Sequence, residues 1–383
     1  MPATSKLLGN KIGKVIKYTV FATNIIAILF LLSSLLAWNI VPSKMTIIAY
    51  LGLAFPIILF INIGYLILWT VFWRWKYALV QLVVILACWQ PISTCFPVHF
   101  ETSAKNLPEN RIKVLTYNVR GFNWLRGDKA RSNPMWEYIT HSNADIICFQ
   151  EFVVSETKGK NMIISESELN GIMKDYPYRS IIELGRPRKS KRSYKYGIAC
   201  YSKFPITESL KVPIESTYNG SGLFTLEIQG RKVTLVVNHL ESNRLTSEDK
   251  KLYKDFLKTR DRESFDEMAN TLQTRLGAAY EIREAQANMI RAFMDKQEAD
   301  ATIVCGDFND TPISYAYHTI KGDDLVDSYA NSGFGQGITY HENYFLVRID
   351  FILHSKAFES YNCTVDKVKF SDHYPVWTYL AFK

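Results

Sequence analysis

The chain has 383 residues, and its 45 Lys and Arg exceed its 37 Asp and Glu by a formal charge of +8, a value typical of nucleic-acid-binding proteins. Residues 1–100 hold seven of the basic residues and none of the acidic ones, so the remainder has 38 basic and 37 acidic residues. Because residues 101–383 are nearly neutral, their net charge does not support a general polyanion binder.

Three long apolar stretches fill the first hundred residues, at roughly Tyr18–Ile40, Met45–Trp73 and Tyr77–Phe96. A membrane-spanning helix needs about 20 mostly apolar residues, and the first two stretches reach that length without a charge. The third contains Gln81 and Pro91, so it is either a short span or an interfacial helix, and we favour the span. The sequence therefore predicts an N-terminal bundle of about three transmembrane helices.

The basic residues around these stretches predict the topology. Lys11, Lys14 and Lys17 precede the first stretch, whereas Arg74 and Lys76 separate the second from the third, and the positive-inside rule places both groups in the cytoplasm. A cleaved signal peptide is excluded because the first stretch is too long and two more follow. Three spans put the C-terminal domain outside the cytoplasm, as in a multi-pass protein of a bacterial inner membrane. Two spans would put the domain in the cytoplasm.

The organisation of the chain follows from these segments. We predict a membrane anchor over residues 1–96, a linker over 97–111 and a single catalytic domain over 112–383. Helical patterns such as Trp136–Ser142 separate only some of the β-rich runs, which favours an α/β sandwich of two sheets flanked by helices over an alternating parallel sheet. The predicted strands are Lys113–Val119, Ile146–Phe149, Gly197–Ser202, Leu223–Ile228, Lys232–Asn238, Thr302–Gly306, Arg348–His354 and Val376–Phe382.

Two segments of the second part allow both a structural and a functional interpretation. The stretch Ser247–Gln297 has apolar residues at helical spacing, which predicts two solvated helices on a sheet edge with a possible break at Gly277. The alternative is an acidic face for a partner. The dense basic run Arg186–Arg192, continued by Lys195, is either a solvated loop or a contact for phosphate or an anionic membrane.

Polar residues stand where the apolar runs of the second part end, as in Val114–Asn118, Asp145–Glu151 and Ile303–Asn309. Carboxylate and carboxamide oxygens suit Mg²⁺, Mn²⁺ or Ca²⁺, and imidazoles bind phosphate and transfer protons. This inventory predicts a hydrolytic site for a hard metal. The residues concerned are Asn118, Glu151, Asn238, His239, Asp307, Asn309, Asp350, Asp372 and His373.

Six short motifs in a fixed order make the prediction specific. They are Tyr117-Asn118-Val-Arg, Gln150-Glu151, Asn238-His239-Leu240, Gly306-Asp307-Phe-Asn309, Arg348-Ile-Asp350-Phe-Ile and Ser371-Asp372-His373-Tyr-Pro-Val. Each is weak alone, but together they resemble the endonuclease/exonuclease/phosphatase superfamily, which includes pancreatic-type deoxyribonuclease and neutral sphingomyelinase. The resemblance spans residues 113–377 and implies metal-dependent hydrolysis of a phosphoester.

The resemblance also implies roles for individual residues. Glu151 is the expected principal metal ligand, with Asn118 and Asp372 close to the metal and its waters. Asp307 and Asn309 are the expected pair that orients and activates the attacking water.

Physical chemistry agrees with these roles, because a phosphodiester is an anion that repels hydroxide until a cation and strong donors offset its charge. His239 and His373 are expected to bind phosphoryl oxygens as imidazolium donors, and one of them to transfer a proton. Asp350 is expected to orient His373, and the residue that acts as general base stays open. The expected substrate-binding residues are Arg120, Tyr196 and Asn238.

We therefore predict a membrane-anchored phosphoesterase that uses Mg²⁺, with Mn²⁺ or Ca²⁺ as alternatives. Its expected substrate is a phosphodiester, in a nucleic acid or a phospholipid headgroup, and the core motifs do not choose between these. The alternative is a catalytically silent membrane receptor on the same fold, which the loss of a motif residue would reveal. No motif position is lost, and Glu151→Gln would abolish hydrolysis by an enzyme yet spare binding by a receptor.

Overall fold

The computed structural model describes residues 2–185, 194–214, 216, 218–243, 248–249, 251–252, 255, 258, 261–342 and 345–383. The chain forms two compact units, Met1–Ile92 with Ile313–Tyr315, and Ser93–Pro312 with Ala316–Lys383. We call them the helical unit and the sheet unit. The basic run Arg186–Arg192 lies outside the described residues, so its two interpretations stay open.

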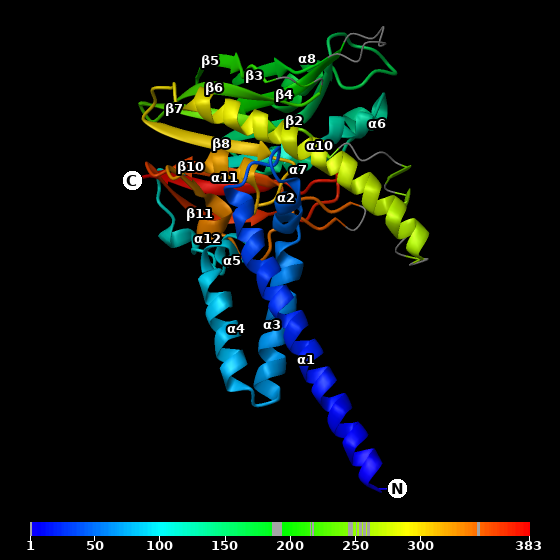
Figure 1. Cartoon of the computed structure of the whole chain (residues 1–383). Helices are drawn as coiled ribbons and strands as arrows, with labels where there is room; N and C mark the ends of the chain where they lie inside the picture. The colour runs from blue at the N-terminus through cyan, green and yellow to red at the C-terminus, as the bar shows by residue number, and fades with distance from the viewer. Residues whose placement is uncertain are drawn as a thin grey trace. The chain divides into compact units, whose positions relative to one another are not determined.

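The helical unit is built from the apolar stretches (Figure 1). By length and composition, the segment Gly13–Trp38 can cross a membrane, and the number of spans rises to three if each of two pairs of helices, bent by 63°, is one span. The three-helix anchor therefore stays a prediction. The elements are α1 (Pro2–Ser34), η1 (Leu35–Trp38), α2 (Thr46–Leu53), α3 (Phe55–Val71), α4 (Trp75–Ala87) and α5 (Trp89–Cys95), which continues into the sheet unit.

Buried carboxamides join three of these helices. Asn24 of α1 donates to Gln81 of α4 at 2.7 Å, and Gln81 donates to Asn62 of α3 at 2.7 Å. The indole of Trp69 donates to Asn24 at 2.8 Å, and Asn62 donates to two backbone carbonyls of α1 and α3. Gln81, which weakens the apolar character of the third stretch, is thus the central link between the helices.

The sheet unit contains two six-stranded mixed sheets, which confirms the prediction of two sheets. Their strand orders are β11-β12-β1-β2-β4-β3 and β5-β6-β7-β8-β10-β9. All eight predicted strands are present, and β3, β5, β9 and β11 are additional. The bounds are β1 (Ile112–Asn118), β2 (Ile146–Ser155), β3 (Tyr178–Glu183), β4 (Tyr194–Ser202), β5 (Ile206–Lys211), β6 (Gly220–Ile228), β7 (Arg231–His239), β8 (Ala301–Asp307), β9 (Leu325–Asp327), β10 (Asp350–Ser355), β11 (Phe358–Val365) and β12 (Val376–Phe382).

Helices cover the outer faces of both sheets. Apolar side chains of the two inner faces, such as Val114 and Leu235, meet in a common core. Trp136 of α7 packs on the outer face of the first sheet, and Ile290 of α10 packs on the outer face of the second. The helices of this unit are η2 (Ala104–Asn106), η3 (Arg120–Trp124), α6 (Asp128–Arg131), α7 (Met135–His141), α8 (Glu166–Ile172), α10 (Arg262–Met294), α11 (Tyr315–Lys321) and α12 (Ser328–Ser332).

The long helix α10 corrects one prediction. It continues through Gly277, where we expect a possible break, and it packs on the face of the second sheet rather than on an edge (Figure 1). A single glycine costs a helix only about 1 kcal/mol, and the neighbouring leucine and alanines are strong helix formers. Burial of Ala287 and Ile290 against Val236 and Val304 supports the helix further. Residues 247–260 are only partly described.

Candidate active site

Two parallel strand pairs bring most of the predicted site residues to one place. In the first sheet, Asn118 at the end of β1 pairs with Gln150 of β2. In the second sheet, His239 at the end of β7 pairs with Asp307 at the end of β8. Strand β10 runs antiparallel to β8, and its first residue, Asp350, lies opposite Asp307. Because the carboxyl ends of parallel strands share one edge, polar residues that end separate strands become neighbours.

A bulge in β2 presents Glu151. The pairing of β2 with β4 shifts register between Phe149 and Phe152, and Glu151 has a φ of +48°. Such a bulge redirects a side chain that a regular strand would point elsewhere. The Glu151 carboxylate accepts from Asn118 Nδ2 at 3.2 Å and keeps 30 % of its side-chain surface exposed.

The centre of the site is the buried carboxylate of Asp307. Its Oδ2 accepts from Asn118 Nδ2 at 3.0 Å and from Asn309 Nδ2 at 3.2 Å, and its Oδ1 accepts from the Asn309 backbone N–H at 2.8 Å. Burial raises the pKa of Asp307 to about 6, although the positive charge of His373 opposes this shift. Asn118 therefore bridges the carboxylates of Asp307 and Glu151, which come from different sheets.

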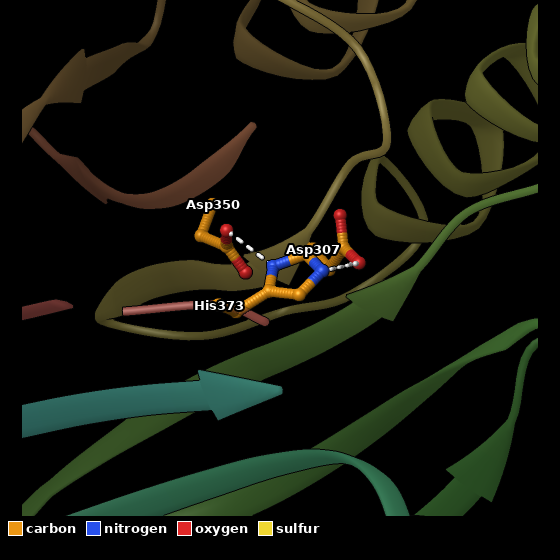
Figure 2. A group of neighbouring side chains, drawn as sticks. All are labelled: Asp307, Asp350 and His373. Carbon is orange, nitrogen blue, oxygen red and sulfur yellow. Dashed lines mark hydrogen bonds and ion pairs between the residues drawn. The ribbon is translucent and has the colours of Figure 1, made fainter. Parts of the chain in front are cut away.

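His373 lies between two carboxylates (Figure 2). Its Nδ1 is 2.9 Å from Asp350 Oδ2, and its Nε2 is 3.7 Å from Asp307 Oδ2. Burial lowers the pKa of His373, but the two carboxylates outweigh burial and raise it to about 10. An imidazolium has no free lone pair. These three residues lie close enough to hold a cation, with ligand atoms within 4.8 Å of one another, but we interpret them as an imidazolium that is hydrogen-bonded to Asp350 and ion-paired with Asp307.

His239 differs from His373 in its protonation. Its Nε2 is 3.2 Å from Asn219 Nδ2, which can only donate, so Nε2 is the acceptor and Nδ1 carries the hydrogen. Burial lowers the pKa of His239 despite the nearby carboxylate of Asp307. Both observations favour a neutral His239 in the free protein, whereas the sequence predicts an imidazolium donor, and that role stays a prediction. Its Nε2 lies 3.8 Å from Glu151 Oε1.

Arg120, Asp372 and Tyr196 lie around this centre. Arg120 Nη1 contacts Glu342 Oε1 at 2.7 Å, and its Nε is 3.7 Å from Asp372 Oδ2. The hydroxyl of Ser371 donates to the Asn118 carbonyl oxygen at 2.8 Å and lies 3.2 Å from Asp372 Oδ1. Tyr196 is buried, and burial together with the site carboxylates raises the pKa of its hydroxyl.

Asn238 is the most incompletely bonded of the predicted residues. Both polar atoms of its buried amide lack a hydrogen-bond partner among the described residues. Its strand partner is Gly306, whose φ is +120° and whose missing Cβ would lie 2.1 Å from the Asn238 carbonyl oxygen. Only glycine allows this close approach. A buried amide without partners is a place where a ligand would find both a donor and an acceptor.

Several residues of the site carry no signal in the sequence. Glu342 binds Arg120, Asn219 binds His239, and the Thr339 hydroxyl accepts the N–H groups of Ile349 and Asp350 at 3.0 and 3.1 Å. All three lie in loops, outside the motifs. Their type and spacing are ordinary for turns, so only the fold brings them to the site.

The comparisons with known proteins agree with this geometry. The model of the Endonuclease/Exonuclease/phosphatase family matches residues 115–373, more than half of the chain. The chain belongs to this family. Its members hydrolyse phosphate esters and typically depend on a divalent metal ion. Residues 17–95 match a second family, described as a domain of unknown function (DUF8431), and no curated protein matches the chain.

Solved structures of the family share the fold. One is an endonuclease/exonuclease/phosphatase from Beutenbergia cavernae, with a TM-score of 0.50 and 16% identity over 72% of this chain and 72% of that one. Another is the human nocturnin catalytic domain with bound sulfate anion, with a TM-score of 0.50 and 16% identity over 72% of this chain and 96% of that one. At such identities the similarity shows the fold and leaves the substrate open.

The donor set fits a hard divalent cation of the kind that the family uses. Burial and the negative charge of Asp372 raise the pKa of Glu151, although His373 opposes them. The carboxylates are therefore crowded, and a cation held by Glu151 and Asp372 beside Asn118 would relieve their repulsion. Their oxygens suit Mg²⁺, Mn²⁺ or Ca²⁺, and nothing in the chemistry of the set selects among these ions.

Proposed function

We propose that this family member is a membrane-anchored, divalent-metal-dependent phosphodiesterase. The observation that carries the proposal is the continuous line of contacts from Glu151 through Asn118, Asp307 and His373 to Asp350. It combines a metal-binding carboxylate, a carboxylate with a pKa of about 6 and a fixed imidazolium. These are the groups that hydrolysis of a phosphate ester needs.

The proposed mechanism assigns one task to each group. Asp307 takes the proton of the attacking water, because its oxygens are fixed by Asn118 and Asn309 and its pKa lies near neutrality. The His373 imidazolium, held by Asp350, donates to a phosphoryl oxygen as negative charge builds on it. A bound divalent cation would supply further charge neutralisation at the phosphoryl group.

The charge balance of the site favours a diester over a monoester. Arg120 is already bound by Glu342 and lies near Asp372, so the phosphate meets little free positive charge from this side chain. His373 contributes one further cation, which the two flanking carboxylates largely offset. A diester carries one negative charge at neutral pH, whereas a monoester carries nearly two.

Features of the helical unit support the membrane anchor. The segment Gly13–Trp38 is long and apolar enough to cross a membrane, and each bent helix pair is apolar enough to be a further span. Buried carboxamides of Asn24, Asn62 and Gln81 satisfy one another, as polar residues inside a bilayer must. If the helical unit crosses the membrane three times, the positive-inside rule places the sheet unit on the side opposite the cytoplasm, as in a protein of a bacterial inner membrane.

Hydrolysis by the full-length protein in detergent micelles tests the proposal. With Mg²⁺, bis-p-nitrophenyl phosphate should be cleaved at least about tenfold faster than p-nitrophenyl phosphate. EDTA should stop the reaction, and Glu151→Gln should lower kcat/KM by about 10²-fold or more. Glu359→Gln, which removes a surface carboxylate paired with Lys383, is the matched control and should keep activity.

The other outcomes are equally informative. Turnover of the monoester alone would contradict the diester proposal while keeping a phosphoesterase. If the protein binds Mg²⁺ and the phosphodiester but cleaves no diester at any incubation time or temperature, the proposed enzyme activity is contradicted. That outcome would favour the receptor on the same fold.

A further inference from the structure

A left-handed turn follows the first strand of the site. All five residues of η3, Arg120–Trp124, have φ between +49° and +60°, and only Gly121 is free of the usual penalty for this conformation. Consecutive left-handed residues persist only where the surroundings hold them, and such strain concentrates at functional sites. The turn begins two residues after Asn118, whose Oδ1 accepts the Arg120 N–H at 3.1 Å.

The sheet unit holds this turn firmly. Phe122 packs against Trp136 with ring centroids 4.4 Å apart, and Asn123 donates to the Phe370 carbonyl at 2.6 Å. A side chain at Gly121 would meet the Trp124 indole, because an added Cβ would lie 2.7 Å from Trp124 Nε1. The turn therefore fixes the Trp124 ring over its own backbone, and the first residue of the turn contacts Asn118.

Trp124 is part of a row of aromatic rings, which we call the aromatic wall and define as Trp124, Tyr196 and Tyr218. Trp124 and Tyr196 are nearly parallel, at 8° with centroids 6.5 Å apart, and Tyr218 meets Tyr196 edge-on at 6.1 Å. Trp124 is 41% exposed and Tyr218 is 45% exposed. Both residues therefore keep surface that a ligand can contact.

Two rings of the wall, Tyr196 and Tyr218, border the proposed catalytic groups. Tyr218 precedes Asn219, whose amide contacts His239 at 3.2 Å. Tyr196 pairs across the strands with Val153, two residues beyond Glu151, and the charge of Glu151 acts on its hydroxyl. A phosphoester bound at Glu151 and His373 would therefore place one of its alcohol groups beside these rings.

We propose that the aromatic wall stacks on a flat ring in the alcohol portion of the substrate, the chemistry of a nucleobase. This inference rests on the proposed phosphodiesterase function and names its substrate class as a nucleotide or single-stranded nucleic-acid diester. Stacking binds bases without charge, which suits a sheet unit that lacks the basic excess of a duplex binder. A quaternary ammonium headgroup, which also binds aromatic faces, is the competing ligand.

Three chromogenic diesters that release p-nitrophenol separate these ligands. They are the p-nitrophenyl esters of thymidine 5′-monophosphate, methyl phosphate and phosphocholine, tested on the full-length protein with Mg²⁺. We expect Trp124→Ala to raise KM for the thymidine ester about tenfold more than KM for the methyl ester, whose single flat ring is the p-nitrophenyl group that all three esters share. Trp124→Phe should restore most of the loss, and Tyr218→Ala should give a smaller loss of the same kind.

Phe100→Ala is the matched control, because it removes an exposed ring that pairs with Phe334 rather than with the wall. Equal losses on all three esters would overturn the inference, as would no loss on any. A loss confined to the phosphocholine ester would overturn it in favour of a headgroup site. If wild type cleaves no ester, the proposed function fails, and calorimetric binding of thymidine 5′-monophosphate to wild type and Trp124→Ala tests the wall separately.

Discussion

Two buried polar clusters in this chain are built in opposite ways. In the helical unit, Asn24, Asn62 and Gln81 are neutral, and every polar atom of their side chains has a hydrogen-bond partner. In the sheet unit, the site combines buried charges and leaves polar atoms open. Among the described residues, His239 Nδ1, Asp350 Oδ1 and the amide of Asn238 lack partners.

The difference indicates what each cluster is for. A closed neutral network lowers the cost of burying polar groups and fixes how helices pack. An open charged network is costly to bury, so its persistence implies a ligand or a reaction that uses the free atoms. The comparison predicts opposite phenotypes: mutations in the open cluster should affect activity more than stability, and mutations in the closed cluster should do the reverse.

Asp307→Asn should give the largest effect. The change keeps the volume of the side chain and one of its two acceptor oxygens, so a hydrogen bond from either Asn118 or the Asn309 backbone persists, but it removes the proposed proton acceptor. We expect kcat/KM to fall about 10³-fold. The melting temperature should stay equal or rise, because a buried negative charge beside other carboxylates is gone. A clear loss of stability would show that this cluster, too, is mainly structural.

Metal ions should stabilise the open cluster. At a Mg²⁺ concentration of about 100 times Kd, binding contributes about 2.7 kcal/mol to the folded state. The transition of the sheet unit should move to higher temperature with Mg²⁺ and return with EDTA. Glu151→Gln should lose most of this shift, and Glu359→Gln should keep it. The same shift in both variants would place the ion elsewhere.

Gln81→Leu tests the closed cluster. Leucine fills similar space but leaves Asn24 Nδ2 and Asn62 Oδ1 without their hydrogen-bond partner. We expect a loss of about 0.6–2 kcal/mol in detergent unfolding experiments and a change in kcat/KM below twofold. Val83→Ala, at an exposed position of the same helix, is the control. A large loss of activity would show that the helices also tune the site.

The central strands of both sheets are predictable from the sequence, whereas the edge strands are not. The eight predicted strands are the interior strands of the two sheets, and the four unpredicted ones, β3, β5, β9 and β11, are the edges. Interior strands are buried on both faces and read as apolar runs. Edge strands such as β5, Ile206–Lys211, are half exposed and carry Thr, Glu, Ser and Lys, which gives them the composition of a loop.

The site, too, is predictable from the sequence only where its residues belong to local patterns. The order of the motifs located the strand-end residues, because each motif is local in the chain. The protonation state of His239 and the partners Asn219, Glu342 and Thr339 depend on contacts between distant segments, which no local pattern records. At Gly277 the local pattern is misleading, because the glycine indicates a helix break but packing against the sheet keeps the helix continuous.

A buried histidine outside the site provides the smallest test. His354 in β10 is buried, its Nδ1–H donates to the Ser355 carbonyl at 3.0 Å, and its Nε2 has no partner among the described residues. Burial lowers its pKa below the usual 6.5. Above pH 6.5 both the folded and the unfolded protein hold this residue neutral. As the pH falls below 6.5, the unfolded state binds the proton first, so stability decreases.

His354→Leu removes this titration. We expect the melting temperature of wild type to fall more between pH 7 and pH 5 than that of His354→Leu, measured without metal. His239 titrates in the same direction in both proteins, so the difference between them isolates His354. His141→Gln, at an exposed position of α7, should behave like wild type. Equal pH dependence in His354→Leu and wild type would mean that water reaches His354 Nε2. A missing hydrogen-bond partner would then identify a functional cluster only where buried charges accompany it.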